Sequence, residues 1–344
     1  MTEIPEETAN PSLSWVAAAL EHDEGSGTPA ARRWLAGLGR PTAIYLASRA
    51  LVVAVFWITA AFSHQTLGQV IGRWDSKWFL AAAARGYPSR LPLLHGHVIA
   101  NTLAFFPGLP LSMRAVSAVT SLSLFGSGIV VSSLTGLTAT IGVWLLVRSY
   151  RGTGVADRAT FLFAFFPATF AFSMIYSEGI AITCVAFGLL ALLKERWVTA
   201  GVLGALATFT SPIALIFVLS CGWVAVGSMR RRRSWRPLAA PLLAPSGAVA
   251  YLLWCAAHTG TLAAWSRTER DGWHSYVSLA FPVHVVAAFV AHPFSDQAAP
   301  SVSTPASIML FFCVFIVIGL VVLAWRDHAP PPVLIYGIGV IVLA

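Results

Sequence analysis

Long apolar runs alternate with short polar connections along most of the chain. Runs of about 17–25 apolar residues are long enough to cross the hydrocarbon core of a bilayer as α-helices. A β-barrel would instead show short segments of alternating hydrophobicity, and the sequence has none. The pattern therefore predicts an all-α polytopic membrane protein with about 8–9 membrane helices. The expected apolar segments are 42–63, 119–147, 158–174, 177–193, 197–229, 238–257, 304–325 and 331–344.

One of these segments is interrupted, and two long connections differ from the rest. Segment 197–229 contains Thr210-Ser211-Pro212, so we expect two short helices that meet at Pro212. Residues 64–104 and 258–303 are polar and aromatic, and we interpret them as loops. Within the first loop, residues 76–85 are rich in helix formers but too short to span, which predicts an interfacial helix.

The two ends of the chain differ in composition, with a polar N-terminal stretch and an apolar C-terminal segment. Residues 1–40 are acidic and then rich in Gly, Pro and Ala, without an apolar run near the start, which is typical of a disordered cytoplasmic tail rather than a signal peptide. The transmembrane domain is expected over 41–344. Its last segment, 331–344, is too short to span fully and stops without a polar flank, so we expect a C-terminal truncation.

Composition supports a membrane protein and narrows its partners. Charged residues make up 10% of the chain and the mean hydropathy is +0.74, which excludes a soluble globular domain. The net charge of +8 comes from basic residues at segment ends rather than from one basic domain, so we expect lipid and not nucleic acid as the partner. The four cysteines lie in apolar stretches without CxxC spacing, which favours buried side chains over disulfides or zinc.

The positions of Lys and Arg predict the orientation. Basic residues gather in the tail, in 148–158, in 194–196, in 230–236 and at 326, which should be cytoplasmic. The loops 64–104 and 258–303 and the turn Tyr176-Ser177-Glu178 then lie on the extracytoplasmic face. We therefore expect the acidic residues of these regions on one side of the membrane: Asp75, Glu178, Glu269, Asp271 and Asp296.

Asp75 is the most informative of these acids. The chain has 14 Asp and Glu residues, and six of them lie in the N-terminal tail. An acid this scarce near a bilayer is a functional candidate by default. Asp75 lies between Arg73 and Lys77 and beside Trp74 and Trp78. The alternative is an interfacial ion pair with Arg73 or Lys77 that only anchors the loop.

This residue set matches the needs of a sugar transfer from a lipid phosphate. A carboxylate can take the proton of an attacking sugar hydroxyl. The phosphate departs as a stable anion and needs cations around it, which Arg73, Lys77, Arg267 or Arg270 could supply. Aromatic side chains in the two loops offer surfaces for sugar and lipid: Trp78, Tyr87, Trp265, Trp273 and His274.

Several candidates also have plain structural explanations. Glu178 can be a first-turn acid of a helix with Ser177 as its N-cap. Trp74 and Trp78 can be interfacial anchors. His95-x-His97 is interpreted as part of a solvated loop, and we expect no metal site. The glycines show no phosphate-loop spacing, which argues against a nucleotide cofactor.

Four motifs lie in order along about residues 71–220. They are Arg73-Trp74-Asp75 with Trp78-Phe79 and Gly86-Tyr87; Phe105-Phe106-Pro107 with Pro110; Phe166-Pro167-Ala168-Thr169 through Tyr176-Ser177-Glu178; and the block 197–217. Together they resemble the GPI mannosyltransferase 2 (PIG-V-type) family, with a weaker match over Thr259–Phe281. Two positions depart from the family pattern: Ser211 stands where Arg is usual, and Gly108-Leu109 replaces Leu-Tyr.

The resemblance implies a GT-C glycosyltransferase, a polytopic enzyme that takes mannose from a polyprenyl- or dolichyl-phosphate donor on the extracytoplasmic face. It implies inverting transfer with Asp75 as the base, and a positioning role for Glu178. We expect substrate contacts from Arg73, Trp74, Lys77, Trp78, Tyr87, Tyr176, Glu178, Arg267 and Arg270. The expected partners are the lipid-linked donor, which is a substrate rather than a cofactor, a glycolipid or glycoprotein acceptor, and the bilayer of the plasma membrane.

Two other function classes stay open at this stage. A secondary transporter or lipid flippase would show internal inverted repeats and acids near the membrane midplane. An inactive scaffold could keep the fold without the chemistry, because a fold does not fix a function.

Overall fold

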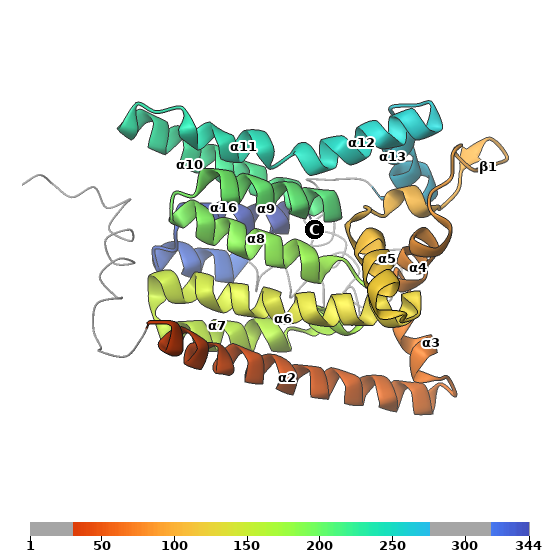
Figure 1. The fold of residues 1–344 in the computed structure, drawn as a ribbon, viewed down its shortest axis with the longest axis horizontal. Helices are drawn as coiled ribbons and strands as arrows, with labels where there is room; N and C mark the ends of the chain where they lie inside the picture. The colour runs from red at the N-terminus through yellow and green to blue at the C-terminus, as the bar shows by residue number, and fades with distance from the viewer. Residues whose placement is uncertain (1–29, 276–317, 344) are drawn as a thin grey trace, which may run out of the picture.

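A computed structural model describes residues 30–275 and 318–343 of the chain. Its helices lie side by side, roughly parallel, in a layered bundle (Figure 1). Helix α6 packs against α7 and α8, α8 packs against α9, and α2 packs against α7. The long helices are α2 (Ala30–Phe62), α6 (Leu124–Arg151), α7 (Thr153–Phe165), α8 (Glu178–Leu193), α9 (Trp197–Thr210), α10 (Ile216–Arg232), α12 (Ser246–Thr259) and α16 (Pro331–Leu343).

The described helices support a membrane protein. Four helical stretches are long and apolar enough to span a bilayer: Gly37–Phe62, Leu124–Arg151, Pro212–Arg232 and Arg236–Thr259, the last of which includes α11 (Ala239–Leu243). A fifth span results if α7 and the 3₁₀ segment η2 (Pro167–Ser173) are taken together across their 75° bend. The apolar helices α8, α9 and α16 are shorter. The all-α membrane class is thus supported with four to five such spans in the described residues, fewer than the predicted total of about 8–9.

The structure agrees with some of the predicted helix boundaries and differs from others. The interfacial helix predicted at 76–85 is present as α4 (Ser76–Arg85), and the break at Pro212 separates α9 from α10. Helix α2 begins at Ala30 and continues through Pro41, so it includes the last residues of the predicted tail 1–40. Residues 119–120 belong to a separate short helix that the sequence did not predict, α5 (Gly108–Thr120), and α6 begins only at Leu124.

The predicted segment 158–174 is bent rather than continuous. Pro167 disfavours helical backbone at Phe166, which is extended (φ −61°, ψ 132°). The bend frees carbonyl groups, and the buried Arg49 of α2 donates to two of them, those of Ala164 (3.1 Å) and Thr169. It also donates to Thr169 Oγ1 at 3.0 Å. Arg49 therefore faces the protein and holds the bend against α2.

The bundle has two ends of different character. The short elements gather at one end, on the right of Figure 1, which we call the site end. They are α3 (Leu67–Ile71), α4, the hairpin β1 (Leu93–Leu94) and β2 (His97–Val98), η1 (Thr102–Ala104), α5 and α13 (Ala264–Arg267). The opposite end, which we call the basic end, holds the helix termini with Arg148–Arg151 and Arg230–Arg232.

Close contact between α6 and α8 depends on glycine. A Cβ atom on Gly179 would lie 2.4 Å from Thr135 Oγ1 and 3.0 Å from the Gly136 nitrogen. Gly179→Val should therefore push α8 from α6 and lower the melting temperature of the purified protein, because overpacking costs about 1–3 kcal/mol. The matched control is Gly222→Val, since a Cβ there meets nothing within 4 Å. Equal melting temperatures for the two variants would contradict this packing.

Candidate functional site

The turn between α3 and α4 presents the Asp75 carboxylate. Helix α3 starts at a capping box in which Thr66 and Gln69 bond each other's backbone. Trp74 then adopts a left-handed conformation (φ 52°), which is uncommon for a bulky residue and marks a constrained site. Asp75 occupies the N-cap position of α4, yet its side chain makes no capping hydrogen bond. The local fold therefore leaves this carboxylate available.

Hydrogen bonds join this turn to the Tyr176-Ser177-Glu178 turn, about a hundred residues later. The Asp75 backbone N–H donates to Tyr176 Oη at 3.3 Å, and the Ile175 N–H donates to Ser76 Oγ at 3.2 Å. The rings of Phe79 and Tyr176 lie 6.5 Å apart. Two motifs that are distant in sequence thus lie side by side.

The second predicted loop reaches the same place. Asn101 Nδ2 donates to Thr268 Oγ1 at 3.2 Å, and Trp273 Nε1 donates to the Asn101 carbonyl at 3.4 Å. The Trp273 ring also meets the Trp78 ring edge-on at 5.0 Å. The π-helical turn η5 (Thr268–Gly272), which carries Glu269, is thereby held beside α4.

Asp75, Glu178 and Glu269 form an acidic group at the site end. Burial raises the pKa of Asp75, an effect that the charge of Lys77 opposes. Burial, followed by the charge of Asp75, raises the pKa of Glu269 to about 7. Glu178 is the first residue of α8 and is near enough to Asp75 for their charges to interact. Within residues 30–275 and 318–343 no cation lies within 4.0 Å of the Asp75 carboxylate, so the predicted alternative of an anchoring ion pair is not formed.

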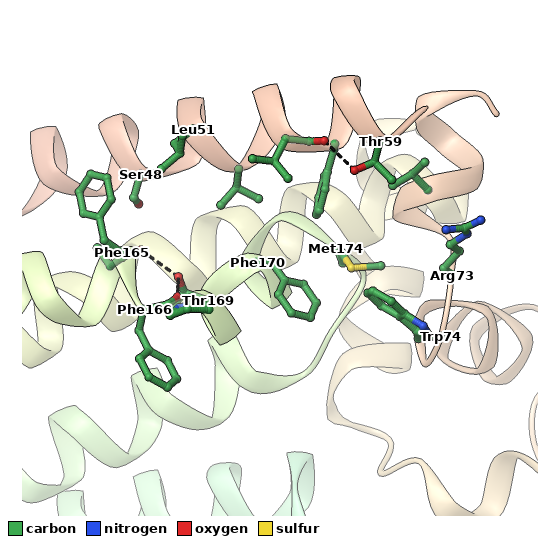
Figure 2. A pocket seen from close by; sticks show the side chains of 16 residues that line it. Ser48, Leu51, Thr59, Arg73, Trp74, Phe165, Phe166, Thr169, Phe170 and Met174 are labelled. Carbon is green, nitrogen blue, oxygen red and sulfur yellow. Dashed lines mark hydrogen bonds between the residues drawn. The ribbon is translucent and has the colours of Figure 1, made fainter. Parts of the chain in front are cut away.

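An apolar groove ends at Arg73 and Trp74, the two residues that precede Asp75 in the chain. It has a volume of about 410 Å³ and runs between α2 and the bent segment α7–η2; we call it the α2 groove. Figure 2 shows Arg73 and Trp74 at one end and Ser48 and Phe165 at the other. Trp74 packs on Phe170 at 5.6 Å. The groove is lined mainly by Leu51, Val52, Val55, Phe56, Phe165, Phe170 and Met174. Its shape and lining suit a hydrocarbon chain with an anionic group near Arg73.

No known protein-family model, curated protein or solved structure matches this chain. The resemblance to the GPI mannosyltransferase 2 family therefore rests on the sequence motifs alone. What the structure adds is the spatial meeting of the first and third motifs.

The remaining predicted contact residues are less closely gathered. Lys77 is exposed, with Nζ 5.6 Å from the centre of the Trp78 ring. Arg267 Nε lies 4.0 Å from a carboxylate oxygen of Asp271, and Arg270 is exposed. Tyr87 lies beyond the far end of α4 and donates to the Phe105 carbonyl at 3.0 Å. Asp296 lies outside the described residues.

Some neighbours of the site were not predicted from the sequence. Asn101 connects the two loops, yet it does not stand out in composition or spacing. Phe105 belongs to the Phe105-Phe106-Pro107 motif, but the motif does not predict that its ring stacks on Trp78 at 6.1 Å. His95 lies in the turn of the β1–β2 hairpin, and His97 is the first residue of β2. Across the described ranges, no three His, Cys, Asp or Glu side chains are close enough to hold a metal ion.

Proposed function

We propose that this chain is an integral-membrane glycosyltransferase with a GT-C-like arrangement of about 8–9 membrane helices. It moves a sugar, mannose by resemblance, from a polyprenyl-phosphate donor to a glycolipid or glycoprotein on the extracytoplasmic face of the cell membrane. One observation carries the proposal: the Asp75 carboxylate, which makes no capping hydrogen bond, lies two residues along the chain from Arg73, and Arg73 lines the end of an apolar groove. This combination supplies a base, a cation and a lipid site together.

The proposed reaction is a single displacement. Asp75 takes the proton of the acceptor hydroxyl as that oxygen attacks the anomeric carbon of the donor sugar. The bond from the anomeric carbon to the phosphate oxygen breaks, and the polyprenyl phosphate leaves as an anion near Arg73. Because Asp75 acts as base and not as nucleophile, the anomeric configuration inverts. Trp74 covers the lipid groove, and Trp78 with Trp273 forms an aromatic wall beside the acids.

The test is transfer of label from polyprenyl-phosphate-[¹⁴C]mannose by membranes that contain the protein, against membranes that lack it. Protein-dependent appearance of label in an extracted glycolipid or glycoprotein supports the proposal. A transporter or flippase would move the labelled lipid or sugar across proteoliposomes without any covalent product. If the protein supports neither sugar transfer nor transport, the result would favour an inactive scaffold.

The raised pKa of Glu269 predicts that the KM for the donor depends on pH. With a pKa of about 7, raised mainly by burial, its carboxyl is mostly neutral below neutrality and charged above it. The added negative charge beside Asp75 repels the donor phosphate, so the KM for donor should rise as the pH passes upward through about 7. Glu269→Gln should reduce this rise.

The measurement is the donor KM about one pH unit below and above that value. The matched control is Glu195→Gln, which removes a carboxylate at the basic end, where Glu195 pairs with Arg232 at 2.6 Å. The assignment is wrong if the Glu269→Gln profile retains the wild-type rise.

A further inference from the structure

A second cavity lies at the opposite end of α4 from Asp75. Its volume is about 580 Å³, and α4, α5, the end of α9 and the C-terminal half of α12 enclose it; we call it the α4–α12 pocket. Helix α4 has ten residues and so separates the two sites by about 15 Å. Apart from Tyr87, the proposed transfer reaction uses none of the residues of this pocket.

Two arginines give the pocket its charge. Arg85 lies in the last turn of α4, and Arg114 comes from α5. Arg114 Nε donates to the Ala83 carbonyl at 2.5 Å, which fixes the guanidinium and leaves its terminal N–H groups for a ligand. In the part of the chain that the structure describes, no carboxylate lies within 4.0 Å of either guanidinium. Two such uncompensated guanidinium groups suit a phosphate, which accepts paired hydrogen bonds from arginine.

The other wall of the pocket is aromatic. Trp254 stacks on His258 at 4.6 Å and meets the edge of Tyr87 at 5.4 Å. The hydroxyls of Tyr87 and Tyr251 donate to the backbone carbonyls of Phe105 and Leu103, so these phenols are already bonded within the protein. The aromatic surfaces that line the cavity are therefore apolar. Pro107, Pro110, Leu111 and Ala250 continue this apolar lining.

We propose that the α4–α12 pocket binds the phosphate-bearing headgroup of an anionic membrane lipid. A small soluble phosphate would meet the arginines but leave the apolar and aromatic wall unused, whereas a lipid uses both. This binding does not depend on the proposed transfer function.

The experiment measures binding of three probes to the purified full chain in neutral detergent micelles. Dioctanoyl phosphatidylglycerol carries both the phosphate and the apolar chains, dioctanoylglycerol lacks the phosphate, and glycerol 3-phosphate lacks the chains. Wild-type protein should bind the phospholipid at least about tenfold more tightly than either other probe, because dioctanoylglycerol loses the charge-assisted contact with the arginines and glycerol 3-phosphate loses the contact with the apolar wall. Equal affinity for dioctanoylglycerol would overturn the phosphate contact. Equal affinity for glycerol 3-phosphate would overturn the lipid assignment in favour of a soluble phosphate.

Variants then locate the site. Arg85→Gln with Arg114→Gln should weaken phospholipid binding at least about tenfold, and Arg85→Lys with Arg114→Lys should retain part of it, because charge is kept and the paired geometry is lost. Arg90→Gln is the matched control, since Arg90 is exposed in the same loop and does not line the pocket. Wild-type affinity in the glutamine double variant would overturn the proposal.

Failure of lipid binding by the α4–α12 pocket can be distinguished from failure of the proposed sugar transfer. Asp75→Asn should bind the phospholipid like wild type even where it transfers no sugar. If the phospholipid binds as expected but the wild type transfers no sugar, the lipid-binding pocket stands and the proposed transfer function falls. If the glutamine double variant shows an unchanged melting temperature, its loss of binding is not a loss of fold.

Discussion

Replacing Asp75 with Asn should reduce the turnover number for sugar transfer by about 10²–10⁴-fold, the usual contribution of a general base. The amide keeps the shape of the carboxylate but cannot take the proton of the acceptor hydroxyl. The Asp75 backbone N–H that bonds Tyr176 is unchanged in the variant, so the turn should keep its structure. The KM for the donor should change little, because Arg73 and the α2 groove remain. The measurement is the initial rate of label transfer at saturating donor.

The matched control for this variant is Asp327→Asn. Asp327 is exposed and lies 3.9 Å from Arg151 at the basic end, so its replacement should leave the rate unchanged. Asp75→Glu should recover part of the activity, since it restores a base in a shifted position. If Asp75→Asn retains more than about a tenth of the wild-type rate, Asp75 does not have the role of base.

Replacing Arg73 with Gln should lower turnover by about 10²–10³-fold, the typical cost of removing one group that stabilises charge in the transition state. Arg73 lines the end of the α2 groove, where the proposed donor phosphate lies. Negative charge grows on this phosphate as the sugar departs. Because the phosphate is charged before reaction as well, the donor KM should also rise. Steady-state kinetics over a range of donor concentrations separates the two effects.

Two further variants make the Arg73 result specific. Arg73→Lys should fall between wild type and Arg73→Gln, because it keeps the charge without the paired donors. Arg90→Gln removes an exposed arginine from the same loop and should behave like wild type. Wild-type kinetics in Arg73→Gln would contradict the placement of the donor phosphate at this end of the groove.

Much of the fold could be predicted because membrane helices follow from simple local patterns. The interfacial helix α4 agrees with its predicted range, and Pro212 breaks the chain where expected, since both depend on short-range propensities. The bend at Phe166 was less visible in the sequence. Pro167 alone is compatible with an ordinary helix start, and the bend is held by Arg49 from a distant helix.

The candidate site was predicted only in part, for a related reason. Charge distribution alone predicted that Asp75, Glu178 and Glu269 share one side, and the structure brings all three to the site end. The hydrogen bond from Asp75 to Tyr176 and the connecting role of Asn101 depend on tertiary contacts between loops. Periodicity and composition contain no signal for such contacts. Arg267 lies near Asp271, its neighbour one helical turn later, which the sequence allowed but did not require.

We propose that the site end, with Asp75, faces the exterior of the cell, where both the lipid-linked sugar and its acceptor are located. Labelling of single introduced cysteines with a membrane-impermeant maleimide tests it directly. Lys77→Cys places an exposed thiol two residues from Asp75, and Arg233→Cys places one at the basic end. Wild-type protein gives the background; Cys184, Cys221 and Cys255 are buried. We expect labelling of Lys77→Cys in intact cells and of Arg233→Cys only after permeabilisation. The reverse result would contradict the proposed orientation of the site end.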